Sequence, residues 1–413
     1  MMNLRTLTLG INIPKDSHDV LQEKIIDFHS AQLEIFKKNK IEHRTNRICT
    51  NPISKTQLNL PTLQSITQWL DGLSKKIDIR WFCLPFNFVD EDMSDINRRD
   101  IVSLVKKYPN LFVNLQISNN KVINSLSAMN AAKLILDVSR LSNNGFDNFR
   151  IGVSSNCNTN TPFFPFSFHT GNEGFSIGLE SLKIFFDEID NSSDINLEKL
   201  RDNMIDRLSR TMKKLDEVCS ELSTQTGMNF LGIDCSIAPF PDGKESVARL
   251  VEKIGLEDFG ANGTLFFTSY LTNIIEESFL RSKAKKAGFN GVMYSVLEDD
   301  FLAESIRKQK LNVDSLMLYS TVCGCGIDMV PVPGNIFKEE IYSIIMDTSA
   351  LSLALKKPLG TRLLPIPNKF SNEITDFNYD FLVDTRIINT QNSSIKFESI
   401  PKHVSNLGKK IGK

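Results

Sequence analysis

The chain has 413 residues, of which 41% are hydrophobic and 23% are charged, a composition that indicates a folded globular protein and argues against a disordered one. Its 48 basic and 49 acidic side chains leave a formal net charge of −1, which provides no long-range field for nucleic acid or an anionic membrane surface. No run approaches the roughly 18 apolar residues of a membrane span, and the N-terminus lacks the apolar core of a signal peptide, so we expect a cytoplasmic protein with neither partner.

The N-terminal part predicts strands and helices in alternation. Apolar residues alternate with polar ones at Leu7, Leu9 and Ile11, which predicts a first strand, and a helical pattern follows up to Lys40. Further strands are predicted at 44–49, 77–86, 111–117 and 149–153, and helices at 62–75, 96–107 and 127–142. This succession predicts an α/β fold with a mostly parallel sheet and helices outside it. In such folds the C-terminal ends of the strands carry the functional site.

A long loop at 154–178 follows the fifth strand and contains the cluster PFFPFSF at 162–168. Loops of this length inside a compact domain are typical of lids or site walls. The apolar cluster could instead be a hydrophobic plug or a contact in a homo-oligomer. His169 is the best candidate among the five histidines for a general base or a metal ligand, and its alternative role is that of a hydrogen-bonded structural histidine.

Residues 180–225 are predicted to be almost wholly helical, and the buried strand FLGIDCSI follows at 230–237. Asp234 lies inside that strand and Ser236 near its end. The strand, a proline-bounded turn and the next helix N-terminus form a possible anion cradle. The alternative is an ordinary strand–helix loop capped by Asp242.

The stretch FGANGT at 259–264 places two glycines before a long apolar helix, so Asn262 and Thr264 are candidates for binding an anionic group. It lacks the lysine of a P-loop, and the glycine pattern of a dinucleotide-binding fold is absent as well. Three carboxylates at 298–300 follow a predicted strand at 291–296. They could hold Mg²⁺ or cap the helix that begins there.

The stretch TVCGCGIDMVPVPG at 321–334 concentrates two thiols, three glycines and the carboxylate of Asp328 after a predicted helix at 311–320. Residues 327–332 predict a strand, and we interpret the stretch as the floor or lip of a site. In KKPLGTRLLPIP at 356–367, Lys357 and Arg362 could bind a carboxylate or phosphate of a substrate. The alternative is a salt bridge from Arg362 to Asp328 or Asp347.

The seven cysteines are scattered without the spacing of a zinc ribbon or a disulfide scaffold, so we expect reduced thiols. Cys323 and Cys325 alone would supply only half of a zinc shell, and we predict no metal site and identify no cofactor. Residues 1–390 are expected to form one domain, and residues 391–413 a polar, basic and frayed C-terminal tail.

Five segments in this order resemble a family without an assigned activity, domain-of-unknown-function family 711, also called uncharacterised protein family 0210. They are RTLTLGINI at 5–13, IDCSIAPFP at 233–241, GANGT at 260–264, VCGCGIDMVPVPG at 322–334 and KPLGTRLLPIP at 357–367. The resemblance implies the fold of pyruvate formate-lyase and anaerobic ribonucleotide reductase, a ten-stranded α/β barrel made of two half-barrels with helices outside. In those enzymes a loop carries a radical cysteine into the barrel, and motif order matches Cys323 to it.

The glycyl-radical signature of those enzymes is missing near the C-terminus, so radical chemistry does not follow from the resemblance. We expect an enzyme that acts on a small anionic metabolite. In this hypothesis Cys323 is the nucleophile or proton donor, Asp234 or Asp328 is an acid–base group or metal ligand, His169 is a further catalytic candidate, and polar and basic residues hold the substrate. Those binding residues are Ser236, Asn262, Thr264, Lys357 and Arg362. The competing hypothesis is a metabolite-binding or regulatory barrel without catalysis.

Overall fold

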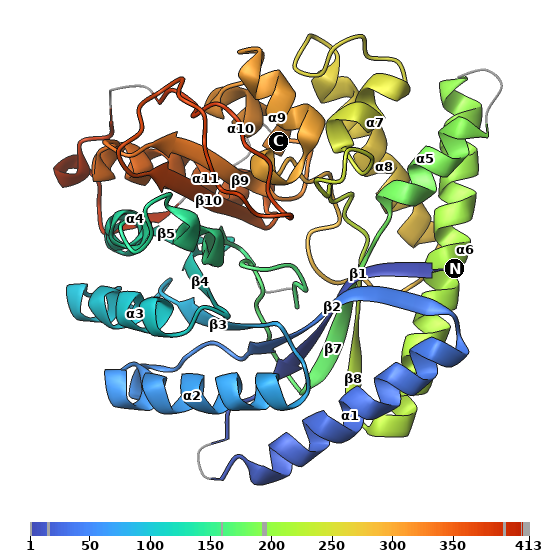
Figure 1. Cartoon of the computed structure of the whole chain (residues 1–413), viewed down its shortest axis with the longest axis horizontal. Coiled ribbons are helices and arrows are strands. Elements are labelled where there is room, and N and C mark those ends of the chain that lie inside the picture. Colours follow the sequence, from blue (N-terminus) through green and yellow to red (C-terminus); the bar gives the residue numbers. More distant parts are fainter. Residues whose placement is uncertain are drawn as a thin grey trace.

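The computed structural model describes residues 2–14, 17–157, 160–191, 196–390, 394–405 and 407. Within these ranges one 11-stranded mixed sheet forms the centre of the protein, and helices cover its outer side (Figure 1). The strands are β1 (Met2–Ile11), β2 (Ile41–Thr50), β3 (Trp81–Asn87), β4 (Leu111–Ser118), β5 (Val122–Asn124), β6 (Ile151–Ser155), β7 (Gly174–Leu179), β8 (Asn229–Asp234), β9 (Gly326–Pro333), β10 (Leu359–Ile366) and β11 (His403–Ser405).

The α-helices follow the same alternation along the chain. They are α1 (Asp19–Lys38), α2 (Leu60–Lys76), α3 (Asp95–Lys107), α4 (Ser125–Ser139), α5 (Leu182–Asp190), α6 (Leu197–Thr226), α7 (Val247–Lys253), α8 (Thr264–Ser282), α9 (Asp300–Arg307), α10 (Val313–Ser320) and α11 (Lys338–Leu355). Short 3₁₀ turns occupy η1 (Lys55–Gln57), η2 (Phe146–Arg150), η3 (Val296–Glu298) and η4 (Phe397–Ser399). The predicted helical stretch at 180–225 is confirmed as α5 and α6.

The strand order is β8-β7-β1-β2-β3-β4-β6-β10-β9, with β5 and β11 attached beside β4. Strands β1, β2, β3, β4 and β6 run parallel to one another, and so do the pairs β7–β8 and β9–β10. The junctions β1–β7 and β6–β10 are antiparallel. The sheet is therefore assembled from two sets of parallel strands that run in opposite directions.

The segment 285–295 lies beside both ends of this strand order without forming a named strand. It makes parallel bridges to β8 and the residues after it, at Ile233–Lys286 and Ile237–Val292. It makes a third parallel bridge to β9, at Ser295–Asp328. The strand predicted at 291–296 is thus present only as these isolated bridges, and the closed barrel expected from the resemblance is not shown by continuous pairing.

Helix starts follow the local sequence signals. Asn59 caps α2 by accepting a hydrogen bond from the Thr62 amide at 3.1 Å, and Pro61 occupies the first turn, where no intrahelical donor is needed. Asp299 caps α9 through the amides of Phe301 and Leu302, and its second carboxylate oxygen accepts the Val247 amide at the start of α7. The capping alternative for the carboxylates at 298–300 is therefore confirmed for Asp299.

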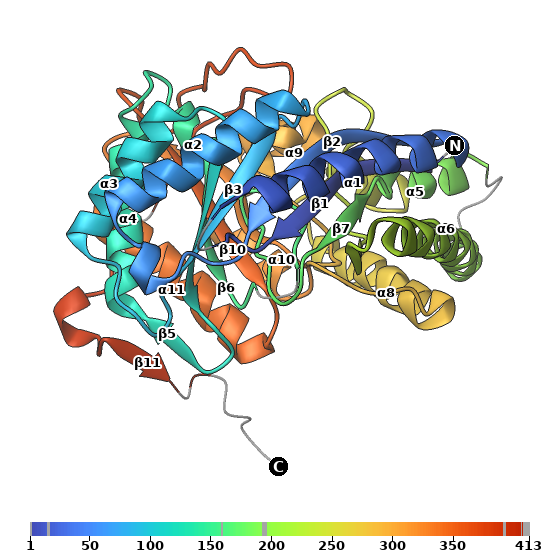
Figure 2. The same ribbon diagram turned by 90° about the horizontal axis from the view of Figure 1, so that it is seen from below.

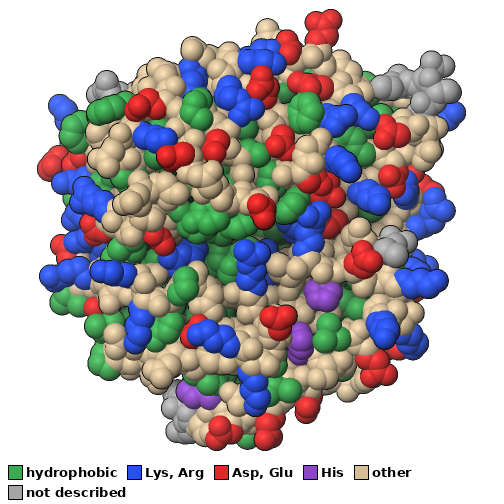
Figure 3. All heavy atoms as spheres, viewed as in Figure 1, with side chains coloured by type: hydrophobic (Ala, Val, Ile, Leu, Met, Phe, Trp, Pro, Cys, Tyr) green, Lys and Arg blue, Asp and Glu red, His purple; other side chains and the backbone are tan. Residues whose placement is uncertain are grey.

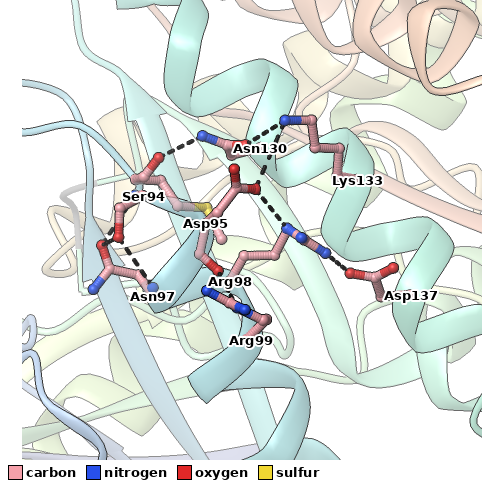
Figure 4. Close-up of polar contacts among 9 residues, drawn as sticks. Ser94, Asp95, Asn97, Arg98, Arg99, Asn130, Lys133 and Asp137 are labelled. Atoms are coloured by element: carbon pink, nitrogen blue, oxygen red, sulfur yellow. Dashed lines mark hydrogen bonds and ion pairs between the residues drawn. The ribbon is translucent and has the colours of Figure 1, made fainter.

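Helices α3 and α4 are joined by a polar network on the outer side of the sheet (Figure 4). Arg98 contacts Asp95 at 3.2 Å and pairs with Asp137, and Lys133 lies 3.7 Å from Asp95. The Asn130 amide donates to the Met93 carbonyl at 2.6 Å, which ties α4 to the turn before α3. These contacts fix the pair of helices that backs β4.

The C-terminal region differs from the frayed tail that the sequence predicts. Although 391–393, 406 and 408–413 lie outside the described residues, β11 pairs antiparallel with β5, from His403–Asn124 to Ser405–Val122 (Figure 2). The Lys402 ammonium also pairs with Asp92 at 2.6 Å. The expectation of a frayed tail is therefore wrong for residues 402–405, although Lys402, His403 and Ser405 are exposed. Among the described helices, none combines the length and apolar composition needed to cross a bilayer.

Candidate functional site

The clearest candidate site is a cavity of about 460 Å³ at one end of the sheet. Five arginines and seven aromatic residues dominate its lining, and the remaining side chains are Thr45, Glu298, Asn378 and Asp380. The arginines are Arg5, Arg44, Arg47, Arg80 and Arg362; the aromatic residues are Trp81, Phe112, Phe149, Phe164, Phe240, Tyr379 and Phe381. In Figure 3 the surface is hollowed near its centre, where hydrophobic side chains lie with Lys or Arg side chains beside them.

The fold brings this lining together from the beginnings of one strand set and the ends of the other. Trp81 is the first residue of β3, and Phe112 is the second residue of β4. Phe240 follows β8, and Glu298 follows the bridging segment 285–295. The C-terminal strand ends, where the sequence predicts a site, contribute to this cavity from the second set, and the first set contributes its strand beginnings because the two sets run in opposite directions.

Arg47 is the residue that sets the electrostatics of the cavity. It lies in β2 opposite Thr8 of β1, and only 7% of its surface is exposed to solvent. Its Nε donates a hydrogen bond to the Thr45 hydroxyl at 3.1 Å. In the described part of the chain no carboxylate forms an ion pair with it. Burial lowers the pKa of Arg47 to about 9; the cation Arg5 acts in the same direction, and Glu298 opposes the shift. A buried guanidinium without a counterion is costly unless an anion joins it.

The other arginines fall into two groups. Arg5 lies 3.5 Å from Glu180, and Arg44 pairs with both Glu180 and Glu245, so acidic groups outside the cavity compensate these cations. Arg80 is exposed and forms no ion pair with any described residue, and its guanidinium lies 4.3 Å from the centre of the Trp81 ring. The positive charge left without a partner therefore gathers around Trp81.

The loop at 160–171, which we call the inner loop, fills the concave side of the sheet. The Pro162 carbonyl accepts from Thr8 of β1 at 2.8 Å, and the Ser167 carbonyl accepts from Asn114 of β4 at 3.1 Å. Its phenylalanines at 163, 164, 166 and 168 are buried. Because contacts reach strands on both sides of the strand order, the sheet must curve around this loop. The plug interpretation is supported, and the proposed oligomer contact through these phenylalanines is wrong since the chain itself covers them.

Glycines on the inner side of four strands make room for the inner loop. A Cβ atom at Gly10 of β1 would lie 2.2 Å from the His169 ring, and one at Gly178 of β7 would lie 2.8 Å from Phe163. The same holds for Gly152 of β6 and Gly360 of β10, which face Phe166 at 2.9 and 2.4 Å. Any larger residue at these positions would displace the loop.

His169 is enclosed by this arrangement. Both of its ring nitrogens are buried and have no hydrogen-bond partner among the described residues, so the predicted hydrogen-bonded structural histidine is wrong in that respect. Burial lowers the pKa of His169 from 6.5 to about 4, and the charge of Glu173 opposes the shift only in part. The side chain is therefore neutral near pH 7. Its role as a general base stays a prediction, since it does not line the cavity.

The low pKa of His169 predicts a pH dependence of stability. Because its folded pKa lies near 4 and its unfolded pKa near 6.5, the protein should lose about 3 kcal/mol of unfolding free energy as the pH falls from 6.5 to 4. Urea denaturation between these pH values measures the loss. In His169→Phe, which keeps a ring but cannot ionise, the unfolding free energy should fall less steeply with decreasing pH. An identical pH dependence in both proteins would contradict a lowered pKa for His169.

Asp328 and Arg362 form an ion pair with each other, so they do not act as two independent site residues. Arg362 donates to Asp328 through Nε at 2.7 Å and through Nη2 at 2.9 Å, and both side chains are buried. The predicted salt bridge is therefore confirmed. Arg362 also lines the cavity, 3.7 Å from Glu298, whereas Asp328 lies behind it.

Asp234 and Ser236 form a buried hydrogen-bonded group. Asp234 is fully buried and accepts from the amide and hydroxyl of Ser236 and from the amides of Phe289 and Asn290. Burial raises the pKa of Asp234, and these hydrogen bonds oppose the shift. The pair fastens β8 to the segment 285–295 and does not line the cavity.

Cys323 and Cys325 lie in the turn between α10 and β9, and both are 2% exposed. The hydrogen bond from Cys325 lowers the pKa of the Cys323 thiol to about 6, burial opposes this shift, and the Lys357 ammonium favours it. Lys357 also donates to the Cys323 carbonyl. Neither thiol lines the cavity, and neither lies on the inner loop. The catalytic role of Cys323 stays a prediction.

The remaining predicted binding residues lie elsewhere. Asn262 is exposed in the loop before α8, and the Thr264 hydroxyl is occupied by the Ala261 carbonyl and the Gly260 amide. Four lining arginines were not among the site residues predicted from the sequence: Arg5, Arg44, Arg47 and Arg80. The sequence signal that could have identified them is a charged residue within an otherwise apolar strand. Arg47, directly before the buried Ile48 and Cys49, is an example.

The sequence of this chain is similar to those of proteins described as uncharacterised. A model of the family described as "Uncharacterised ACR (DUF711)" matches residues 1–381. A UPF0210 protein of Clostridium perfringens is 26% identical over 408 residues, covering 91% of this chain and 88% of its own. UPF0210 proteins of Methanocaldococcus jannaschii and Neisseria gonorrhoeae are 24% and 23% identical, with the same shares of both chains covered.

Proposed function

The chain belongs to this uncharacterised family, DUF711, and we propose that it binds a small anionic metabolite in the arginine-lined cavity at one mouth of an α/β barrel. The observation that carries the proposal is the buried Arg47 guanidinium without a carboxylate partner among the described residues. A cation in this position is destabilising in the empty protein, and an anionic ligand would relieve it.

Barrel closure is part of this proposal. Segment 285–295 bridges β8 on one side and β9 on the other, and all three bridges are parallel. Counting this segment with the nine strands of the main order, and leaving out β5 and β11, would give ten strands in two parallel sets of five that run in opposite directions. The inner loop, which contacts strands of both sets, supports a closed cross-section. The mouth would then combine the beginnings of one set with the ends of the other.

The lining supports anion binding more directly than it supports a particular reaction. Guanidinium groups offer paired hydrogen bonds to carboxylate or phosphate, and the aromatic rings offer faces for the apolar part of a ligand. Glu298 lines the cavity, accepts the Ser295 hydroxyl at 2.8 Å and lies 3.7 Å from Arg362, and it could supply acid–base chemistry to a bound ligand. An enzymatic role is therefore a second candidate, and it would use Glu298 ahead of Cys323.

Arg47→Gln provides the test of anion binding. We expect its affinity for small carboxylates and phosphates, measured by titration calorimetry, to fall by about 10- to 100-fold, because a charge-assisted hydrogen bond contributes about 1.5–3 kcal/mol. The empty variant should be at least as stable as the original protein, since a buried uncompensated charge is removed. Unchanged anion affinity would refute the proposed site.

Arg150→Gln is the matched control, because Arg150 is also buried but has structural partners. Its guanidinium donates to the carbonyls of Val105, Tyr108 and Leu111 at 3.0, 2.8 and 3.3 Å and pairs with Asp147. This variant should lose stability and retain anion affinity. The two arginines are thus expected to show opposite effects on the two measurements.

A further inference from the structure

Two guanidinium groups without ion-pair partners in the described chain share one aromatic ring in the cavity. The Arg47 guanidinium carbon lies 5.3 Å from the centre of the Trp81 ring, and that of Arg80 lies 4.3 Å from it. Arg80 also lies 5.3 Å from the Phe381 ring. Aromatic faces attract guanidinium groups and limit their orientations, so both cations are held near the same place before a ligand arrives.

The two sides of the cavity differ in charge balance. On the side of Phe240, Arg44 lies 4.1 Å from the ring centre, and Glu180 and Glu245 neutralise it. On the side of Trp81, Glu298 is the acidic group whose field reaches Arg47, and it already lies beside Arg362. The Trp81 side is therefore where a ligand's negative charge is best compensated.

We propose that the cavity selects a dianionic group, a phosphate monoester or a vicinal dicarboxylate, which binds between Arg47 and Arg80 with a flat apolar body against the aromatic wall. This inference rests on the proposed function and narrows its ligand class. A monoanion would compensate one of the two cations and leave the other without a partner. A dianionic phosphate has enough acceptor oxygens for both guanidinium groups at once.

The test compares probes that share a ring and differ in charge. Binding of phenyl phosphate, phthalate and benzoate is measured by calorimetry at pH 7.5 and constant ionic strength, because screening would otherwise differ between them. We expect the affinity for phenyl phosphate to exceed that for benzoate by at least about 10-fold. This ratio corresponds to about one additional charge-assisted hydrogen bond. Phthalate binding as tightly as phenyl phosphate would assign the preference to dianions in general; phthalate binding like benzoate would assign it to phosphate. Both results support the proposal.

Arg80→Gln separates this inference from anion binding as such. The variant should reduce the preference for phenyl phosphate over benzoate by about 5- to 10-fold and change benzoate affinity by less than about twofold. Arg140→Gln, which removes an exposed arginine at the end of α4 outside the cavity, should change neither value. If Arg80→Gln weakens all three probes equally, Arg80 provides only general attraction and the inference fails.

A pH series gives an independent readout. The second ionisation of a phosphate monoester lies near pH 6, whereas a carboxylate stays ionised down to about pH 5. Phenyl phosphate affinity should therefore fall toward that of benzoate between pH 7.5 and 5, while benzoate affinity stays constant. Equal affinities for phenyl phosphate and benzoate at pH 7.5 would overturn the dianion inference and leave anion binding intact. Failure of every probe to bind would overturn both.

Discussion

Replacing Asp328 by alanine is expected to lower the free energy of unfolding by about 3–5 kcal/mol, because Arg362 would remain buried without its main partner. The pair is bidentate, and the side chains of Arg362 and Asp328 are only 3% and 7% exposed. The Phe149 carbonyl, 3.2 Å from Arg362, and Glu298, 3.7 Å from it, would retain part of the interaction, which favours the lower end of this range. Chemical denaturation of the two proteins measures the difference.

Two further variants show whether charge burial is the cause. The double replacement Asp328→Leu with Arg362→Met removes both charges and should recover stability to within about 1–2 kcal/mol of the original protein, since well-packed apolar groups can replace a buried pair. Asp206→Ala breaks the exposed pair with Arg210, whose side chains are 50% and 74% exposed, and should cost less than about 1 kcal/mol. A loss below about 1 kcal/mol for Asp328→Ala would contradict the explanation.

Asp234→Ala is expected to have a comparable effect, about 3–5 kcal/mol, for a different reason. Four donors point at this carboxylate: the Ser236 amide at 2.9 Å and hydroxyl at 2.6 Å, and the amides of Phe289 and Asn290 at 2.7 and 3.1 Å. Each buried donor left unpaired costs about 1–3 kcal/mol, although the hydroxyl can reorient. Asp234→Asn retains an acceptor oxygen but faces one amide with its own NH₂, so it should lose about half as much.

The location of the loss can be measured as well as its size. Hydrogen bonds from Ala287 to Ile233 and from Met293 to Ile237 hold segment 285–295 against β8 and the residues after it, at 2.9 Å each. In Asp234→Ala the amides of this segment should exchange with solvent faster than those of β3 and β4, because local opening precedes global unfolding. Unchanged exchange in 285–295 would mean that Asp234 does not fasten this segment.

Much of the fold could be predicted from the pattern of the sequence. The strands at 111–117 and 327–332 and the helix at 311–320 match β4, β9 and α10 closely, because apolar runs bounded by glycine or proline allow few alternatives. The pairing of β11 with β5 could not be predicted. Each has three residues, His403–Ser405 and Val122–Asn124, too few for a periodic signal.

The candidate site was less predictable because it depends on which way strand residues face. Arg47 became a cavity residue through the register that places it opposite Thr8 and Trp81, and register is a property of strand pairs. The stretch 321–334 was predicted to form part of a site because of its glycines and thiols. In the structure these glycines allow close backbone approach, since a Cβ at Gly326 would lie 2.3 Å from the Gly360 carbonyl oxygen and one at Gly334 would lie 2.2 Å from the Ile366 carbonyl oxygen. Unusual composition therefore marked tight packing there, while Arg362 alone of the predicted binding residues lines the cavity.

The glycines that accommodate Phe163 and Phe166 have a consequence for any chemistry this protein performs. Because the inner loop fills the concave side of the sheet, the space left for a ligand is the arginine-lined cavity at one end of the strands. Reaction intermediates that water hydrolyses would be poorly protected in a cavity open to solvent. Proton transfer or reversible ligand binding does not require water to be excluded. Shortening 162–168 would leave Gly152, Gly178 and Gly360 facing a space that these glycines have no side chains to fill.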